Sequence, residues 1–167
     1  TYVNLTSIDA RLDFGASGVL VSDDSYMSKI ITEKPNNLKQ FTNLGFQSYY
    51  VSQEELDLMQ KLFFDAYRLG EISSDLHESE PILRDTDILS VDFNAIKASE
   101  LDFNLGNPNG FDGAQICTLM RYAGLSDRLS VLGLFDIPST PRSDKLLAQM
   151  IWYLSLIHIS EPTRRAI

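Results

Sequence analysis

The sequence has little of what several common kinds of site require. Its single cysteine, Cys117, excludes an internal disulfide and a metal cluster held by thiolates. It has two histidines, and we interpret His77, which lies in a polar stretch, as a solvated surface residue. No apolar run approaches the roughly 18–20 residues of a membrane helix, and no signal peptide is recognisable. We therefore expect no membrane partner and a cytoplasmic location.

Basic residues are also scarce. The chain has 14 Lys and Arg against 23 Asp and Glu, for a formal net charge of −9, and no basic run exceeds two residues. This balance argues against binding to a phosphate backbone, so we expect no nucleic-acid partner. It remains compatible with a cation site, because carboxylates attract metal ions. The 44% hydrophobic content is ordinary for one globular domain of 167 residues.

Strand-like and helix-like segments alternate along the chain. The apolar runs are short and do not alternate in polarity, which is typical of strands buried on both faces. The pattern predicts an α/β fold with a mostly parallel sheet covered by helices on both sides. The expected strands are residues 3–8, 44–50, 88–91 and 129–135, and the expected helices are about 22–31, 52–69, 81–84, 113–123 and 143–154.

The two ends of the chain have unusual features. The sequence starts without Met and almost directly with a strand, as a piece of a longer protein would. The last segment, "SLIHISEPTRRAI", resembles translated read-through of a sequencing adapter. We therefore divide the chain into a natural part, 1–154, and a non-native tail, 155–167. The alternative is a genuine flexible tail.

Aspartates end three of the four expected strands, in "SIDARLD", "LSVDFNA" and "GLFDIPS". Ligands bind outside the carboxyl ends of the strands in open α/β sheets, so Asp9, Asp92 and Asp136 should converge there, with Asp13 nearby. Crowded carboxylates raise one another's pKa unless a cation intervenes. The pattern therefore favours a cation site. The alternative is that each Asp caps a local turn.

The same segments resemble a known family. "SIDARLDFG" and "LSVDFNAI" resemble the two metal motifs of the arginase family of ureohydrolases, which includes agmatinase and formimidoylglutamase and whose motifs read Asp-Ala-His-x-Asp and Ser-Phe-Asp-x-Asp. "GNPNGFDGAQICTLMRYAG" and "VLGLFDIPSTP" are similar to a later loop and helix and to a strand that ends in a substrate-facing acid. The resemblance covers most of residues 1–154 and is closest to a divergent formimidoylglutamase-like branch. It implies a three-layer α/β/α sandwich, present as a partial domain without its N-terminal part, and a homo-oligomer at full length.

The resemblance also implies a metal site. Asp9, Asp13 and Asp92 match metal-ligand positions, and Asn94 matches a further ligand that is Asp in the family. Family enzymes hold two Mn²⁺ ions, which generate a nucleophilic hydroxide. Arg11 stands where the family has a His ligand, and a guanidinium cannot bind metal. We expect this guanidinium to pair with the neighbouring carboxylates; the alternative is that it swings outward into solvent.

For the substrate, the resemblance assigns Asp136 to the amidine group and Asn107 to substrate binding. The implied reaction is hydrolysis of a C–N bond in a small linear amidine, with formimidoylglutamate favoured. Because two ligand positions are changed, the metal site is degenerate. The alternative function is therefore a catalytically inactive family member that serves as a binding or regulatory subunit.

Overall fold

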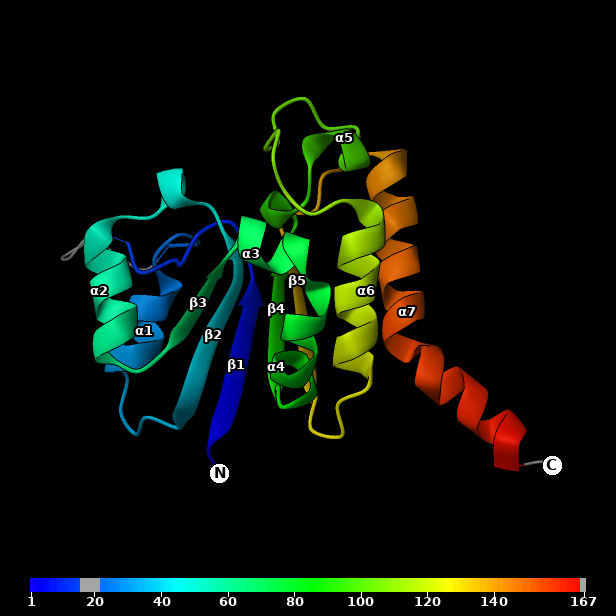
Figure 1. The fold of residues 1–167 in the computed structure, drawn as a ribbon, viewed down its shortest axis with the longest axis horizontal. Helices are drawn as coiled ribbons and strands as arrows, with labels where there is room; N and C mark the ends of the chain where they lie inside the picture. The colour runs from blue at the N-terminus through cyan, green and yellow to red at the C-terminus, as the bar shows by residue number, and fades with distance from the viewer. Residues whose placement is uncertain (16–21, 166–167) are drawn as a thin grey trace.

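A five-stranded, fully parallel sheet forms the centre of the structure (Figure 1). The computed structural model describes the backbone of residues 1–15 and 22–165, with side chains up to residue 157. The strand order is β3-β2-β1-β4-β5, so the N-terminal strand lies in the middle. The strands are β1 (Val3–Ile8), β2 (Leu38–Phe46), β3 (Asp65–Arg68), β4 (Ile88–Asp92) and β5 (Val131–Phe135).

Helices cover both faces of this sheet and create two hydrophobic cores. The helices are α1 (Tyr26–Thr32), α2 (Gln53–Lys61), α3 (Leu69–Ser74), α4 (Glu80–Arg84), α5 (Ala98–Leu101), α6 (Gly113–Gly124) and α7 (Pro141–Arg165), with short 3-10 turns at Ser48–Tyr50, Leu76–Ser79 and Phe93–Ala95. On one face of the sheet, Leu5 and Phe41 pack with residues of α1 and α2. On the other, Ile8 and Leu44 pack with residues of α3, α4 and α6, and α7 lies against α6. The predicted α/β class with helices on both faces of a parallel sheet is confirmed.

Two helix starts follow directly from local sequence chemistry. Ser52 accepts a hydrogen bond from the backbone of Glu55, whose side chain binds back to Ser52. Asp112 and Gln115 form the same reciprocal arrangement at the start of α6. Each pair satisfies two backbone donors that a helix start leaves without partners. These starts agree with the helices expected at 52 and 113.

The expected helix over 52–69 is wrong in its second half. The helix α2 ends at Lys61, and Phe63 adopts a left-handed backbone with φ 56°. The chain then forms β3, where Ala66 pairs with Asn43 of β2. Helical spacing in the sequence could not reveal this break, because Ala66 still packs into the core, but from β3, and Phe64 packs there from just before that strand. Pairing with the neighbouring strand therefore overrides helical propensity.

The second strand and the last helix are also shifted from their expected positions. The strand β2 begins at Leu38 and ends at Phe46, because pairing with β1 holds even polar residues in extended form. The helix α7 begins at Pro141, a favoured first helical position, and Ser143 instead binds the Leu101 carbonyl. It continues to Arg165, beyond the expected end at residue 154. Across the described residues, no helix has the length and apolarity needed to cross a membrane.

Candidate active site

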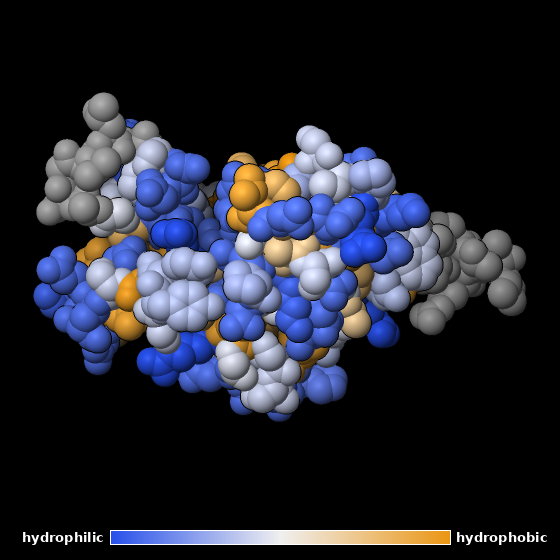
Figure 2. Space-filling model, turned by 90° about the horizontal axis from the view of Figure 1, so that it is seen from above, coloured by the Kyte–Doolittle hydropathy of each residue, from blue (hydrophilic) through white to orange (hydrophobic). Residues whose placement is uncertain are grey.

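The parallel strands bring the predicted aspartates to one edge of the sheet. Asp9 follows β1, Asp92 is the last residue of β4, and Asp136 follows β5. The strands β1, β4 and β5 are neighbours in the sheet, and their ends point the same way in Figure 1. Viewed from above, this end of the molecule is largely hydrophilic, with a hydrophobic patch beside a hollow (Figure 2).

Asp9 and Asp13 form a buried pair. Each side chain is only 5% exposed, and the two carboxyl groups are hydrogen-bonded to each other. Burial, followed by the hydrogen bond to Asp13 and its charge, raises the pKa of Asp9 to about 9. Burial also raises the pKa of Asp13, to about 6, although the hydrogen bond from Asp9 partly opposes the rise. Burial and the neighbouring carboxyl group therefore favour a protonated form of this pair.

Asp92 and Asp136 form a second carboxyl pair. A hydrogen bond joins their side chains, and Asp136 also accepts a hydrogen bond at 3.4 Å from the Asn94 amide. Burial, then the charge of Asp9 and the contact with Asp136, raises the pKa of Asp92 to about 8. The cluster thus consists of two carboxyl pairs that influence one another electrostatically.

Backbone geometry places two of these aspartates in an unusual conformation. Asp13 has φ 60° and Asp136 has φ 54°, both in the left-handed region. Aspartate tolerates this region better than most non-glycine residues, but the conformation is still uncommon. Such conformations concentrate at binding and catalytic sites, where the surrounding structure holds them in place.

Arg11 does not pair with the carboxylates. Its exposed guanidinium lies over the Tyr50 ring, 4.6 Å from the ring centroid. Within residues 1–15 and 22–157, no salt bridge joins Arg11 to Asp9, Asp13 or Asp92. The predicted pairing is therefore wrong and the outward alternative holds. The backbone N–H of Arg11 donates to Asp9 Oδ1 at 3.1 Å, and the charge of its guanidinium partly opposes the rise in the pKa of Asp13.

Asn43 explains the course of this loop and was missed from the sequence. This fully buried residue of β2 donates its side-chain amide to Ser7 Oγ and to the Arg11 carbonyl, each at 3.0 Å. The carbonyl of Arg11 is thereby held against β2 while its side chain extends outward. A polar residue inside a buried strand was the available signal, because such groups need hydrogen-bond partners.

Tyr26 and Ser90 also belong to this site and were not predicted. Burial raises the pKa of Tyr26 above its ordinary value, and the charges of Asp13 and Asp9 add to the rise. Its hydroxyl is hydrogen-bonded to Ser90, two residues before Asp92 on the same strand face. Period-two spacing could have indicated Ser90, but only the folded chain brings α1 to β4.

Asn107 lies in a hydrogen-bonded rim above the strand ends. It accepts from the Tyr50 hydroxyl at 2.8 Å and donates to the Asn94 carbonyl at 2.8 Å. Because Asn94 in turn contacts Asp136, the rim links the turn after β2, the loop before α6, the turn after β4 and the end of β5. The structure thus places Asn107 near the predicted residues, and its contact with substrate stays a prediction.

A cavity of about 450 Å³ opens beside this cluster on the α1 side of the sheet. It is large enough for a small organic molecule. One wall is apolar and includes Ile30, Leu5 and Phe135. The polar groups that border it are Asp9, Asp23, Tyr26, Ser90, Asp92 and Asp136.

The donor chemistry of the cluster suits a hard divalent cation, which prefers carboxylate oxygens. The side-chain arrangement does not reproduce a complete metal centre. Among the residues whose side chains are described, no three His, Cys, Asp or Glu groups come together in a way that could hold a metal ion. The carboxyl groups instead bond to one another in pairs. Asp9, Asp13 and Asp92 are the residues that would hold an ion if these pairs opened.

Comparisons with known proteins agree on the fold. No family model matches the chain, and no curated protein sequence is similar to it. Formiminoglutamase from Trypanosoma cruzi, solved with Mn²⁺, is similar with a TM-score of 0.77 and 14% identity over 91% of this chain and 55% of its own. Formimidoylglutamase from Bacillus subtilis is similar with a TM-score of 0.77 and 14% identity, over 92% of this chain and 52% of its own. Arginase from Entamoeba histolytica, in complex with L-ornithine, is similar with a TM-score of 0.71 and 14% identity, over 92% of this chain and 60% of its own.

These similarities establish an arginase-type fold for the described residues. The chain spans little more than half of the length of these structures, so it corresponds to a partial domain of that fold. At 14% identity the likeness concerns the fold alone. Activity, substrate and metal content are separate questions that rest on the residues of the site.

Proposed function

We propose that the chain carries the active-site half of a hydrolase of small linear amidines, of the formimidoylglutamase type. The observation that carries this proposal is the convergence of four carboxyl groups beside a cavity at the carboxyl end of the sheet. Across residues 1–15 and 22–157 these groups have no cationic partner within salt-bridge distance. Raised pKa values indicate that a cation would be bound favourably there.

The residues have distinct roles in this proposal. Asp136 is an exposed residue that lines the cavity, and its carboxylate would accept hydrogen bonds from the two nitrogens of an amidinium. Asn94 positions Asp136 through its side-chain amide. The apolar wall formed by Ile30 and Phe135 packs against the carbon chain of the substrate. Asn107 holds the rim together and is close enough to Asn94 to orient it.

A divalent metal ion fits the remaining carboxylates in donor type, with Asp9, Asp13 and Asp92 as its ligands. When bound, the ion would supply an acidified water as the nucleophile for the amidine carbon. Asp9 must then give up its proton, and ionised Asp13 and Asp92 offset the charge. Tyr26 lines the cavity from the α1 side, next to these carboxyl groups.

Metal binding and amidine hydrolysis test this proposal together. We expect Mn²⁺ to bind saturably to the chain, and Asp92→Asn to abolish that binding. Asp127→Asn, which removes an exposed aspartate outside the cluster, is the matched control and should bind normally. Asp136→Asn should keep Mn²⁺ binding but lose affinity for acetamidine. Absence of both Mn²⁺ and amidine binding, in a chain that remains folded by circular dichroism, would contradict the proposal.

The two changed ligand positions provide a second test. Arg11→His combined with Asn94→Asp restores the residue types that the family motif has. We expect this double variant to bind Mn²⁺ at least about tenfold more tightly, since a tenfold change needs only about 1.4 kcal/mol. Arg11→Lys with Asn94→Gln, which restores neither ligand, is the control. Equal affinity of all three chains would show that these positions do not face the ion.

A second candidate is a catalytically inactive relative that binds amidines without hydrolysing them. It is favoured by the outward Arg11 and by the lack of a three-ligand group among the described side chains. This candidate predicts saturable amidine binding that does not depend on Mn²⁺. It also predicts no C–N bond cleavage in the double variant.

A further inference from the structure

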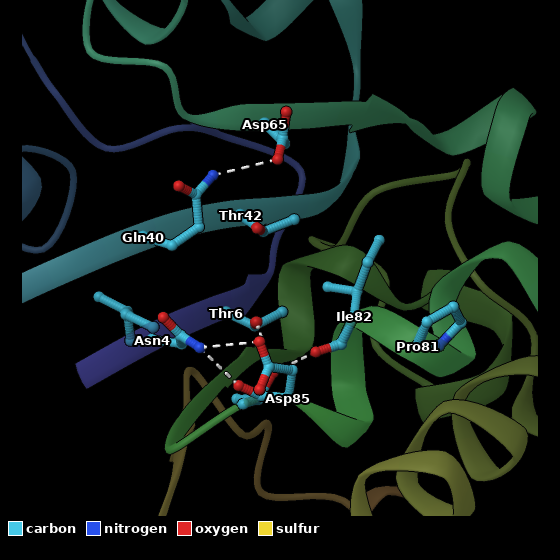
Figure 3. Close-up of a pocket in the computed structure, with 10 residues that line it drawn as sticks. Asn4, Thr6, Gln40, Thr42, Asp65, Pro81, Ile82 and Asp85 are labelled. Carbon is cyan, nitrogen blue, oxygen red and sulfur yellow. Dashed lines mark hydrogen bonds between the residues drawn. The ribbon is translucent and has the colours of Figure 1, made fainter. Parts of the chain in front are cut away.

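A polar groove lies at the opposite end of the sheet from the carboxyl cluster. It encloses about 260 Å³ between the lower halves of β1 and β2, β3 and the helix α4 (Figure 3). Its floor is a face of a parallel sheet, which is normally apolar because helices cover it. Polar residues on this part of the floor therefore need an explanation.

Four polar side chains form the floor as two neighbouring pairs. Asn4 lies beside Gln40, and Thr6 lies beside Thr42, in the register of β1 and β2. Period-two spacing puts all four on one face of the sheet. Farther along the same face, Ile8 and Leu44 are core residues. On this face, the side chains of β1 and β2 therefore change from polar to apolar between Thr6 and Ile8 and between Thr42 and Leu44, where the groove ends.

The side-chain amide of Asn4 uses its nitrogen to bind Asp85 and leaves its oxygen, Oδ1, without a partner among the described residues. Its amide nitrogen donates to the backbone carbonyl of Asp85 at 2.8 Å and to Asp85 Oδ2 at 3.1 Å, which fixes the amide orientation. A flipped amide would place its oxygen against two other oxygens. The residue is only 8% exposed, and its Oδ1 has no hydrogen-bond partner among the described residues. Figure 3 shows this oxygen on the side away from Asp85.

The threonines add further acceptor capacity. Thr86 donates its hydroxyl to the Ile82 carbonyl at 2.8 Å, so Thr6 must be the donor in the 2.7 Å contact between the Thr6 and Thr86 hydroxyls. The oxygen of Thr6 can therefore only accept from a ligand. Thr42, which is 5% exposed, makes no side-chain hydrogen bond within the part of the chain whose side chains are described.

Asp65 supplies a negative charge at the rim of the groove. It is the register partner of Thr42 and accepts a hydrogen bond from Gln40 at 3.0 Å. No Lys or Arg is among the residues that line the groove. The guanidinium of Arg128 contacts the lining residue Asp85, but its donors are taken by Asp85 and Asp87. The groove is thus rich in acceptors and negative in charge.

We propose that this groove binds the planar cationic group of a small amidinium or guanidinium compound. Such a group presents several N–H donors in one plane, and it can reach acceptors on two strands about 4.8 Å apart. One carboxylate with neutral oxygens balances a single positive charge, whereas calcium and similar divalent ions require more carboxylates. The proposal rests on the groove alone and is independent of the function proposed for the strand ends.

Titration of the ¹⁵N-labelled chain with acetamidine tests the proposal. We expect saturable chemical-shift changes at the backbone amides of Thr6 and Thr42. Asp65→Asn should weaken this binding by about tenfold, the loss expected when a charged hydrogen-bond partner is removed. Because Asp65 is exposed, this variant should fold normally. Asp57→Asn, an exposed charge-matched change on α2, should leave the affinity unchanged.

A second pair of variants tests the contribution of a neutral hydroxyl, Thr42, separately from that of the Asp65 charge. Thr42→Val keeps the shape of the side chain but removes its oxygen, so it should weaken acetamidine binding, and Thr42→Ser should restore it. Shift changes around Asp92 report the site at the strand ends and should be unaffected by either variant. The proposal is overturned if the shifts do not saturate, if methylammonium or sodium produces the same shifts, or if Asp65→Asn and Asp57→Asn behave alike.

Discussion

The two ends of the sheet both carry clustered aspartates, but they neutralise the charge in opposite ways. At the amino ends of the strands, Asp85 and Asp87 each lie 3.0 Å from Arg128. Burial alone would raise the pKa of Asp87, but hydrogen bonds from Asn4 and Arg128 lower it below its ordinary value. At the carboxyl ends, Asp9 and Asp92 face other carboxyl groups, and their pKa values rise to about 9 and about 8.

The difference shows that the position of a cation matters more than its presence in the sequence. Both arginines have acidic neighbours in the sequence: Asp127 precedes Arg128, and Asp9 and Asp13 lie two residues to either side of Arg11. Arg128 uses three of its nitrogens on Asp85 and Asp87, whereas Arg11 stacks on Tyr50. The pKa of Asp87 is therefore lowered at one end of the sheet, whereas the pKa values of Asp9 and Asp92 are raised at the other.

The largest expected effect is a fall in stability with rising pH. Asp9 and Asp92 have folded-state pKa values of about 9 and about 8, above the ordinary 3.8, so the folded chain binds more protons than the unfolded one. Their contribution is complete below about pH 4 and is lost as the pH rises toward 9. We expect the free energy of unfolding to fall by several kcal/mol between about pH 5 and 8. Urea denaturation at a series of pH values measures it, and a flat or rising profile would contradict it.

Replacing the Asp9 carboxyl group, at the C-terminal ends of the strands, should stabilise the chain. Asn at position 9 can still accept from the Arg11 N–H and donate to Asp13, without any need to hold a proton. We expect Asp9→Asn to raise the free energy of unfolding by about 1–3 kcal/mol near pH 8 and to change it little near pH 5. Urea denaturation of both chains at both pH values is the measurement. A loss of stability at pH 8 would show that Asp9 is ionised there.

The same substitution at the other edge should have the opposite sign. Asp87→Asn removes the charge that accepts from Arg128 and weakens the 2.8 Å hydrogen bond from the Asn4 N–H. Because the Arg128 side chain is still 42% exposed, we expect a loss of about 1 kcal/mol that shrinks as salt is added. The measurement is the free energy of unfolding of the original chain and of the Asp87→Asn variant at low and high sodium chloride. A gain in stability would mean that Arg128 does not compensate Asp87.

The smallest expected effect belongs to Arg11. An exposed cation over an aromatic ring contributes about 0.5–1 kcal/mol, whereas breaking a buried ion pair costs about 3–5 kcal/mol. Arg11→Ala should therefore cost less than about 1 kcal/mol, and Tyr50→Leu should remove most of the same energy. A double-mutant cycle isolates the contact between the two side chains. A large cost for Arg11→Ala with no coupling to Tyr50 would favour a carboxylate partner instead.

The sequence predicted those elements whose signals are local. Reciprocal caps at Ser52 and Asp112 mark two helix starts, and short apolar runs ending in Asp mark three strands. The strand β3 escaped prediction because its apolar residues fit a helical repeat equally well. Its extended form depends on pairing with β2, which no local pattern records.

The candidate site was predictable in its acidic residues and not in their partners. Strand-end position alone brings Asp9, Asp92 and Asp136 together, because parallel strands end at one edge. The direction of the Arg11 side chain depends on Asn43 and Tyr50, which come from a different strand and a following turn. Proximity along the chain therefore suggested an ion pair that the tertiary contacts do not form.

The central position of β1 has a consequence for the time course of folding. One of the neighbours of this strand, β4, comes more than eighty residues later in the chain, as the contact between Asn4 and Asp87 across 83 positions illustrates. Contacts between such distant segments form slowly, because a long loop must close before they can stabilise the chain. Until β4 arrives, β1 can pair only on its β2 side, and its other edge stays open to other chains. Slow folding, with a period of vulnerability to misassembly, is thus a consequence of the strand order itself.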